Sequence, residues 1–565
     1  MAKPGKVHLL LHAHLPFVRE PSYDRFLEEN WFFEAMAETY LPIIQMLNRL
    51  EEKGVPGTLN FSVSSALLAM LTDKLLLDRF TNHLHKQLEL IEREKISLQN
   101  NFEYLEVVNF YYRRQIALIN TWERDCGCEI IPALKRLEQI GKINLLTCVG
   151  THPFLPAYQS DVEAIRLQLK ITVRAFEEAF GKKPLGLWLP ECGYFEGLDA
   201  ILAEYGFKYF FLETHGVLLA KPAPKYGVFA PIKTPAGLYC FGREQSSSME
   251  VWSRKTGYPG HPEYREFFKD VAHERESDYL GDYFLAAGAH IETGLKYYRI
   301  TGSEDKKVYR PWNALRLVED HARLFVANRE ETVSNLLPNM DGNKVSILCP
   351  YDAELFGHWW FEGPLFIEKM FERAASSNVV EMASLEDSVP TSQTFAGKVA
   401  DDDVHAPIFS SWGEGGFGEV WMNDAVAFQY PMFFKMRGLM NDLKKRVSHG
   451  VSVARGTARG LIGAKSAGTS AAVRGCKTAA DFKIETAQRF LSQIARELVL
   501  FQASDWAFMI HNHSAEDYAR ARLSGHYENV CALYAEAVKA KPDTRLLKKL
   551  EQKNNLFPWI GECLK

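Results

Sequence analysis

The sequence has no marked excess of charge of either sign. It contains 66 lysine and arginine residues against 71 aspartate and glutamate residues, a formal net charge of -5. Nucleic-acid-binding proteins usually carry a basic excess, so this balance argues against DNA or RNA as a partner. No stretch approaches the roughly 18 apolar residues that a membrane-spanning helix needs. We therefore expect a protein that neither binds nucleic acid nor crosses a membrane.

The sequence also lacks a disulfide framework and an export signal. Its nine cysteines are odd in number and irregularly spaced. The apolar run at 7–11 is too short for the core of a signal peptide, and His8 interrupts it. We therefore expect reduced thiols in a cytoplasmic protein. Cys126 and Cys128 form a lone C-x-C pair, which is weak evidence for a metal site, and the sequence predicts no cofactor.

Short apolar runs alternate with amphipathic helical patterns over the first two thirds of the chain. The length of 565 residues predicts two or three domains. A strand, a loop and a helix repeated in this order predict a parallel sheet that helices wind or close. The expected strands lie at 7–11, 58–62, 144–149, 185–189, 209–212 and 345–349.

Helical patterns indicate how the rest of the chain is organised. Residues 1–420 are expected to form a barrel-like α/β catalytic domain, in which 66–142 is an all-helical insertion. Residues 421–565 are expected to form a helical domain. Within it, 449–480 is rich in Ala, Gly, Ser, Val and Arg and has no aromatic residue, which predicts a flexible surface loop.

Polar side chains follow four of the expected strands. These side chains are His12 and His14, His152, Glu191 and Asp352. In barrel-like α/β folds the carboxyl ends of the strands line the active site. The repeated pattern makes a chance arrangement less plausible, so we expect these residues to form one site.

Two carboxylates stand in the densest motifs. Glu191 follows a strand within WLPECGY, and it could act as a nucleophile or base, cap the next helix, or pair with an arginine. Asp352 lies within YDAELFGHWW, with Glu354 two residues later. The two tryptophans of that motif suit either a cleft or ordinary core packing. The local sequence alone leaves these alternatives open.

Histidines and a glycine-rich loop supply further candidates. His12 and His14 lie on one face of an extended strand, where they could bind a metal or act as neutral hydrogen-bond donors. Each of them taken singly could equally be a buried core histidine. The loop SSWGEGG carries Trp412 and Glu414 but lacks the lysine and the spacing of a phosphate loop. Trp412 could stack on a sugar ring or fill a domain interface.

The ordered set of motifs resembles a known family. HAHLPF, THPFLP, WLPECGY, YDAELFGHWWFEGP and SSWGEGG resemble the five motifs of glycoside hydrolase family 57. The segments VWSRKTGYPG, YREF, TGLKYYRITG and QASDW resemble more specifically its α-1,4-glucan branching enzymes and their amylase-like relatives. The resemblance covers almost the whole chain. It implies an α/β fold with an incomplete (β/α)7 barrel, a helical insertion, a C-terminal helical domain, and retaining chemistry without a metal.

The resemblance also implies roles for individual residues. The family's nucleophile corresponds to Glu191, and its general acid/base to Asp352. Positions that form the active site or contact an α-glucan such as amylose correspond to His12, His14, His152, Arg265, Trp412 and Asp505. Trp421 and Trp506 are further candidate contacts with the glucan. For Trp506, which ends QASDW, and for Trp421, core packing is the alternative to a contact with the glucan.

Retaining glycosidases place two carboxyl groups about 5–5.5 Å apart. We expect Glu191 to attack the anomeric carbon, and Asp352 to protonate the leaving oxygen and then deprotonate the acceptor. The acceptor is water in hydrolysis and the 6-hydroxyl of another glucan chain in branching. A branching enzyme must shelter the intermediate from water. The segment 236–258, with Tyr239 and Tyr258, could supply a gating loop for this purpose.

Four functions are open at this point. The motifs favour a 1,4-α-glucan branching enzyme that forms α-1,6 branches in a glycogen-like glucan. An α-amylase or a 4-α-glucanotransferase on the same scaffold is the first alternative. His12 and His14 motivate a metal-dependent polysaccharide deacetylase or mannosidase-like enzyme, in which Glu191 and Asp352 have no clear task. A catalytically silent glucan-binding protein is the last. The sequence predicts no oligomeric state.

Overall fold

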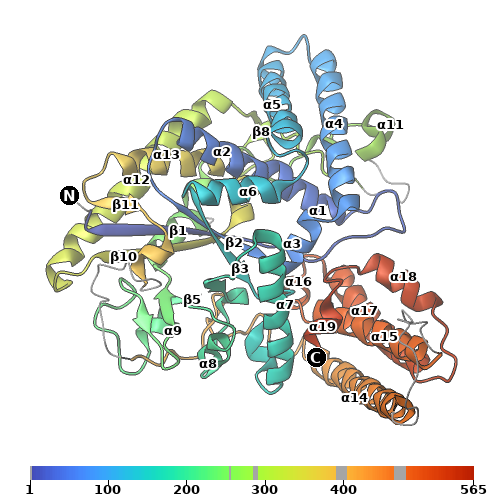
Figure 1. The fold of residues 1–565 in the computed structure, drawn as a ribbon. Helices are drawn as coiled ribbons and strands as arrows, with labels where there is room; N and C mark the ends of the chain where they lie inside the picture. The colour runs from blue at the N-terminus through green and yellow to red at the C-terminus, as the bar shows by residue number, and fades with distance from the viewer. Residues whose placement is uncertain (1–2, 254–255, 284–289, 390–403, 463–478) are drawn as a thin grey trace, which may run out of the picture. The chain divides into compact units, whose positions relative to one another are not determined.

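The computed structural model describes residues 3–253, 256–283, 290–389, 404–462 and 479–565 (Figure 1). The chain divides into two compact units. The first comprises residues 1–149 and 172–412, and the second comprises residues 150–171 and 413–565. None of the described helices is both long and apolar enough to cross a membrane.

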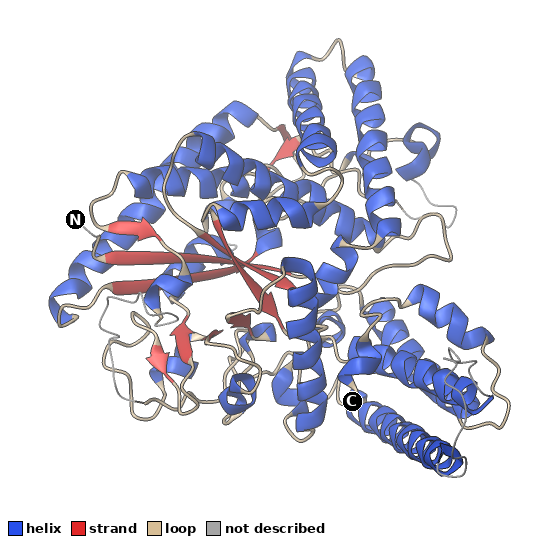
Figure 2. Cartoon of the chain, in the orientation of Figure 1, coloured by secondary structure: helices blue, strands red, loops and turns tan. Residues whose placement is uncertain are grey.

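A curled sheet of nine strands forms the centre of the first unit (Figure 2). The hydrogen-bonded order is β10-β1-β2-β3-β4-β5-β7-β6, and β11 pairs with β1 beside this path. Every pairing is parallel except that of β6 with β7. The sheet, with the helices that cover it, confirms the predicted incomplete barrel. The strands are β1 (Gly5–Ala13), β2 (Leu59–Ser64), β3 (Ile143–Cys148), β4 (Gly186–Trp188), β5 (Tyr209–Leu212), β6 (Ile232–Lys233), β7 (Tyr239–Gly242), β10 (Val345–Asp352) and β11 (Val380–Met382).

The long strands are buried on both faces, and buried polar residues within them are hydrogen-bonded, as Asn144 of β3 is to Asn60 of β2 at 3.0 Å. All six residues of β2 and all six of β3 are buried. The short strand β4 begins at Gly186, where a β-carbon would lie 2.3 Å from the ring of Tyr209 and 2.4 Å from Leu146. Only a glycine lets β4 approach its neighbours this closely.

Large apolar side chains fill the interior of the barrel. Because side chains alternate along each strand, every strand sends one set of residues inward. Close packing of this set fixes the positions of the strands and of the side chains at their ends. The cluster includes Leu10 of β1, Leu146 of β3, Trp188 of β4, Phe211 of β5, Phe241 of β7 and Leu348 of β10.

Helices cover the sheet and build the insertion after β2. Ser64 caps the first helix of the insertion through the backbone N–H of Leu67, and Asp73 caps the second through Leu76. The insertion contains α3 (Ser65–Leu71), α4 (Lys74–Ser97), α5 (Phe102–Asn120) and α6 (Ile130–Gln139). The other helices of the unit include α1 (Glu29–Glu34), α2 (Leu41–Glu52), α8 (Leu198–Ala203), α9 (Thr214–Leu218), α10 (Gln245–Trp252), α11 (Ser277–Leu280), α12 (Pro311–Leu336) and α13 (Gly363–Ala375), and a small ribbon pairs β8 (Tyr298–Arg299) with β9 (Lys307–Val308).

The second unit is helical in its described part. The unit boundary falls inside α7 (Val162–Phe180), so residues 150–171 cluster with the C-terminal helices. Arg437 of α14 forms a paired contact with Asp161, at 2.6 and 2.8 Å, within this unit. Its other helices are α14 (Gln429–Ile462), α15 (Ala479–Phe501), α16 (Ser504–His511), α17 (Glu516–Ala537), α18 (Arg545–Lys553) and α19 (Ile560–Cys563).

The segment 449–480 differs from the flexible loop that its composition predicted. Helix α14 continues to Ile462, and α15 begins at Ala479. Alanine and arginine are strong helix formers, so the same composition can extend a helix that has already begun. The part of the predicted loop at 463–478 lies outside the described residues.

Candidate active site

Asp352 and His12 lie side by side at the carboxyl edge of the barrel sheet. Asp352 is the last residue of β10, and the parallel register pairs it with His12 of β1. Because neighbouring parallel strands end at the same edge, the two side chains reach the region where α/β barrels bind ligands. Asp352 is half-buried, whereas His12 is buried.

The ring of His12 is fixed and uncharged. It stacks on the indole of Trp188 with 4.5 Å between centroids, and its Nδ1 lies 3.3 Å from the hydroxyl of Ser62. Burial lowers the pKa of His12 well below its usual range, and the neighbouring His14 lowers it further. His14 in turn has its Nδ1 2.8 Å from the hydroxyl of Ser64. At neutral pH, His12 is therefore a neutral group that can donate or accept one hydrogen bond.

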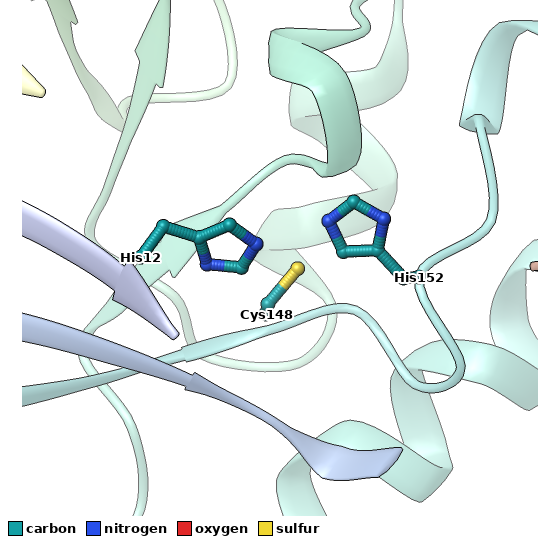
Figure 3. Close-up of side chains that lie close together, drawn as sticks. All are labelled: His12, Cys148 and His152. Atoms are coloured by element: carbon teal, nitrogen blue, oxygen red, sulfur yellow. The ribbon is translucent and has the colours of Figure 1, made fainter. Parts of the chain in front are cut away.

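Cys148, the last residue of β3, lies beside His12 (Figure 3). A ring nitrogen of His12 and the sulfur of Cys148 are within 4.8 Å of each other. Thiolate and imidazole are the ligands that zinc prefers, and zinc sites take at least three ligands from the protein. His12 and Cys148 could supply two of them.

Glu191 sits in a strained turn just after β4. The turn spans Pro190–Cys192, with φ of 60° at Glu191 and 49° at Cys192. Non-glycine residues in this left-handed region cost roughly 1–3 kcal/mol each and cluster at functional sites. The indole Nε1 of Trp412 donates to the carboxylate of Glu191 over 2.9 Å. The backbone N–H of Trp412 also donates to the carbonyl of Glu191, at 3.0 Å.

The buried thiol of Cys192 feels the charges of both Glu191 and Asp352. Burial raises the pKa of the Cys192 thiol well above its usual range, and the negative charge of Glu213 raises it further. Glu191 and Asp352 raise the same pKa, while Arg243 lowers it. Both carboxylates therefore belong to the electrostatic environment of this thiol.

Aromatic and charged side chains surround the indole of Trp412. Its ring meets Trp188 edge to face at 5.0 Å and Trp252 at 6.2 Å. The guanidinium of Arg243 lies over it at 5.7 Å and pairs with Glu213 at 2.9 Å. Our prediction did not include Glu213 and Arg243. Each directly follows a strand, β5 or β7, so the rule that identified Glu191 could have found them.

Glu354, whose role the sequence left open, lies beside Asp352 in the same motif. The hydroxyl of Tyr40 donates to its carboxylate. Burial raises the pKa of Glu354 to about 7, against an ordinary value of 4.5, although the hydrogen bond from Tyr40 lowers it. This carboxyl therefore changes its protonation state near neutral pH.

Both tyrosines of the segment 236–258 pack against other parts of the first unit. Tyr239 begins β7 and packs against the barrel core. The hydroxyl of Tyr258 donates to Glu250 at 2.7 Å, and its ring stacks on His321 with centroids 4.6 Å apart. The described part of the segment consists mainly of β7 and α10, so the expected tyrosine gate is not supported.

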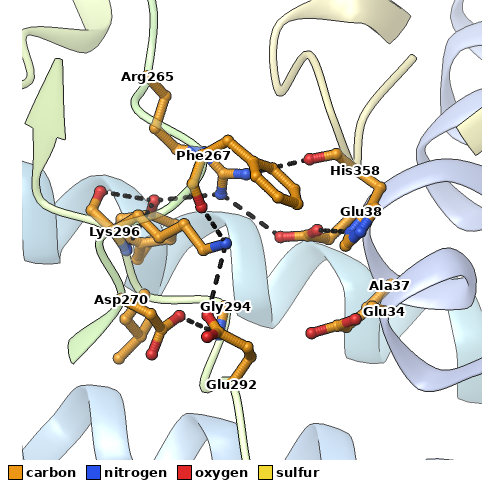
Figure 4. A network of polar contacts seen from close by, with 12 residues as sticks. Glu34, Ala37, Glu38, Arg265, Phe267, Asp270, Glu292, Gly294, Lys296 and His358 are labelled. Carbon is orange, nitrogen blue, oxygen red and sulfur yellow. Dashed lines mark hydrogen bonds and ion pairs between the residues drawn. The ribbon is translucent and has the colours of Figure 1, made fainter. Parts of the chain in front are cut away.

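Arg265 belongs to a separate, buried ion-pair network (Figure 4). Its guanidinium lies 3.4 Å from the carboxylate of Glu38 and over the ring of Phe361 at 4.1 Å. Burial alone would raise the pKa of Glu38, but Arg265 and His358 lower it to about 2. The side chain of Arg265 is only 1% exposed. Its burial does not support the predicted contact with a glucan and favours a structural role.

The second unit contains the remaining predicted residues. Nδ1 of His152, a residue with φ of 63°, lies 2.8 Å from the hydroxyl of Ser504, next to Asp505 at the start of α16. Trp421 is buried and stacks on Phe154 at 4.9 Å. Trp506 is fully buried, and its indole donates to the carbonyl of Leu500 at 2.8 Å. Core packing therefore explains Trp506 better than the predicted glucan contact does.

Known proteins are similar to this chain over nearly its whole length. Residues 8–341 match glycosyl hydrolase family 57, and residues 469–562 match the C-terminal domain of 1,4-alpha-glucan branching enzymes. The 1,4-alpha-glucan branching enzyme TK1436 of Thermococcus kodakarensis is 29% identical, over 99% of this chain and 79% of that protein.

Two solved structures are similar over nearly their full lengths. The alpha-amylase AmyC from Thermotoga maritima has a TM-score of 0.85 and 33% identity, covering 100% of this chain and 99% of that one. The branching enzyme from Pyrococcus horikoshii has a TM-score of 0.81 and 27% identity, covering 99% and 97%. The family match spans more than half of the sequence, and the fold agrees with it throughout. The chain is therefore a member of glycosyl hydrolase family 57.

Proposed function

We propose that the chain is a retaining 1,4-α-glucan branching enzyme, with Glu191 as nucleophile and Asp352 as general acid/base. The observation that carries the catalytic assignment is the carboxylate of Glu191, held by Trp412 at the strand edge where Asp352 also ends. The match of residues 469–562 to the C-terminal domain of branching enzymes supports transfer, and so does the likeness to TK1436. The substrate would be an α-1,4-linked glucan.

The residues suit a two-step reaction. The carboxylate of Glu191 attacks the anomeric carbon while Asp352 donates a proton to the departing 4-oxygen, which gives a glycosyl-enzyme ester. Asp352 then takes the proton from the 6-hydroxyl of an acceptor chain, whose oxygen displaces Glu191. His12, which is neutral and fixed by stacking, can bind a sugar hydroxyl without adding charge.

The setting of Glu191 favours the nucleophile over the acid role. A nucleophilic carboxylate must be ionised and aimed, and a hydrogen bond from a neutral indole serves both needs. The strained backbone at Glu191 and Cys192 ends the extended course of β4 at this carboxylate. The distance between the two carboxyl groups is expected to be the roughly 5–5.5 Å of retaining enzymes.

An α-amylase is the second candidate. The observation that favours it is the 33% identity to the alpha-amylase AmyC, above the 27% to the branching enzyme of Pyrococcus horikoshii. Both reactions would use the same glycosyl-enzyme ester. They differ only in whether water or a 6-hydroxyl displaces it, so the products distinguish them.

The test is to incubate the protein with amylose, count 1,6-linkages by proton NMR and assay reducing ends in parallel. We expect new 1,6-linkages and few reducing ends. Reducing ends alone would establish the amylase. Glu191→Gln and Asp352→Asn should each abolish turnover while glucan binding survives. Glu196→Gln makes the same chemical change at an exposed residue and serves as the control. Full activity of Glu191→Gln would refute the assignment.

The cellular setting is part of the same proposal. We propose a cytoplasmic enzyme that branches a glycogen-like storage glucan. All eight cysteines among the described residues are free thiols, which suits a reducing compartment. Fractionation of cells with an antibody against the chain would test this location.

A further inference from the structure

Helix α10 presents a tryptophan next to the proposed nucleophile. Trp252, the last residue of α10, is 37% exposed. Its ring stands edge to face against Trp412, with 6.2 Å between centroids. Trp412 is the residue whose indole donates to Glu191. An exposed indole one ring away from the carboxylate is therefore part of the surface that surrounds the reacting sugar.

The helix that carries Trp252 is firmly anchored. The side chain of Glu244 caps its amino end by accepting hydrogen bonds from the backbone of Ser246 and Ser247. Near its other end, Glu250 accepts from Tyr258 at 2.7 Å and pairs with the buried Arg329. Bonds at both ends fix α10, so Trp252 has a defined position and not that of a flexible loop residue.

The anchoring also places α10 on the side of Asp352. The hydroxyl of Tyr351 donates to the carbonyl of Ser247 at 2.7 Å, which ties α10 to β10 immediately before Asp352. Asp352 is the group proposed to take the proton from the incoming acceptor. Helix α10 thus contacts Trp412 through Trp252, and it contacts β10, the strand that carries Asp352, through Ser247.

We infer that Trp252 is an acceptor-binding residue, on which a glucosyl unit of the α-glucan acceptor stacks during transfer. This inference rests on the proposed function. An indole is large and apolar, and an exposed one beside a polar site suits the apolar face of a sugar ring. Because the tyrosines of 236–258 are committed elsewhere, Trp252 is the aromatic group that this segment offers.

Two measurements test the inference, with Trp312→Ala as the matched control, since Trp312 is 57% exposed on α12. The first is the affinity of maltooligosaccharides in the non-reacting Glu191→Gln background, by calorimetry. We expect Trp252→Ala to weaken binding about tenfold, equivalent to ~1.4 kcal/mol, and Trp252→Phe to restore most of it. The second is the ratio of transfer to hydrolysis on amylose, which should fall in Trp252→Ala and stay at the wild-type value in Trp312→Ala.

The outcomes separate the inference from the proposed function. A wild-type protein that forms no 1,6-linkages overturns the branching assignment, whereas the binding measurement still decides whether Trp252 holds a glucan. Unchanged affinity in Trp252→Ala overturns the inference whatever the products are. An unchanged ratio of transfer to hydrolysis in Trp252→Ala also overturns it, because the residue would then play no part in binding the acceptor.

Discussion

Replacing Trp412 by phenylalanine removes one hydrogen bond and keeps most of the ring. The indole Nε1 donates to the carboxylate of Glu191 over 2.9 Å, and phenylalanine has no donor. The backbone N–H of residue 412 can still donate to the carbonyl of Glu191, at 3.0 Å. The substitution therefore frees the carboxylate and leaves the loop attached.

The expected loss follows from the strength of this bond. A hydrogen bond to a charged group contributes roughly 1.5–3 kcal/mol. At about 1.36 kcal/mol for each factor of ten, Trp412→Phe should lower kcat/KM by about 10- to 150-fold. Since the bond holds the nucleophile and not the glucan, the loss should appear in kcat, with KM little changed.

An aryl α-maltoside with an absorbing leaving group gives the assay. Release of the aryl group reports the attack of Glu191 directly, and Trp312→Phe on α12 is the control for an exposed tryptophan. A kcat within about twofold of the wild type would refute the reasoning. A large fall in Tm would show instead that the ring contact with Trp188 had been lost.

Three further predictions concern other parts of the molecule. Burial raises the pKa of Glu354 from 4.5 to about 7, so the folded protein binds this proton more tightly than the unfolded protein does. The Glu354 carboxyl therefore lowers the free energy of unfolding increasingly as pH rises from 4.5 to about 7. Glu354→Gln should therefore have a higher Tm than the wild type above pH 7 and no advantage below pH 4.5, by calorimetry; a constant difference would contradict this. Trp506→Ala should cost about 3–5 kcal/mol in urea unfolding and leave KM for amylose unchanged. Dialysis against EDTA should leave activity intact, and loss restored by zinc would support the metal-dependent alternative with His12 and Cys148.

The barrel could be predicted because its strands are buried on both faces. The expected strand at 209–212 is an apolar run that coincides with β5, and the expected strand at 58–62, in which apolar and polar residues alternate, overlaps β2. The rule that polar groups at strand ends form a site also brought Asp352 beside His12, as the register shows. These inferences needed only local patterns and one fact about parallel sheets.

Contacts between distant segments could not be predicted in the same way. Residues 150–171 cluster with the C-terminal helices, partly because Thr151 bonds to the carbonyl of Val499 and Gln168 to Gln502. Nothing in the local sequence of 150–171 indicates which distant residues it contacts. The burial of Arg265 has the same origin, since Glu38 lies 227 positions away.

Two motifs that lie far apart in the sequence act as one structural element around Glu191. Tyr194 and Ser410 exchange backbone hydrogen bonds, at 2.9 and 3.3 Å, and Trp412 adds a backbone and a side-chain bond to Glu191. Two of these bonds are made by Glu191, the first of the two left-handed residues, and two by Tyr194, two positions after Cys192. A strained turn persists only where its surroundings hold it, and here the loop SSWGEGG does so. The loop therefore holds the proposed nucleophile through both its backbone and its carboxylate, which is a stronger reason for its tryptophan than stacking on a sugar alone.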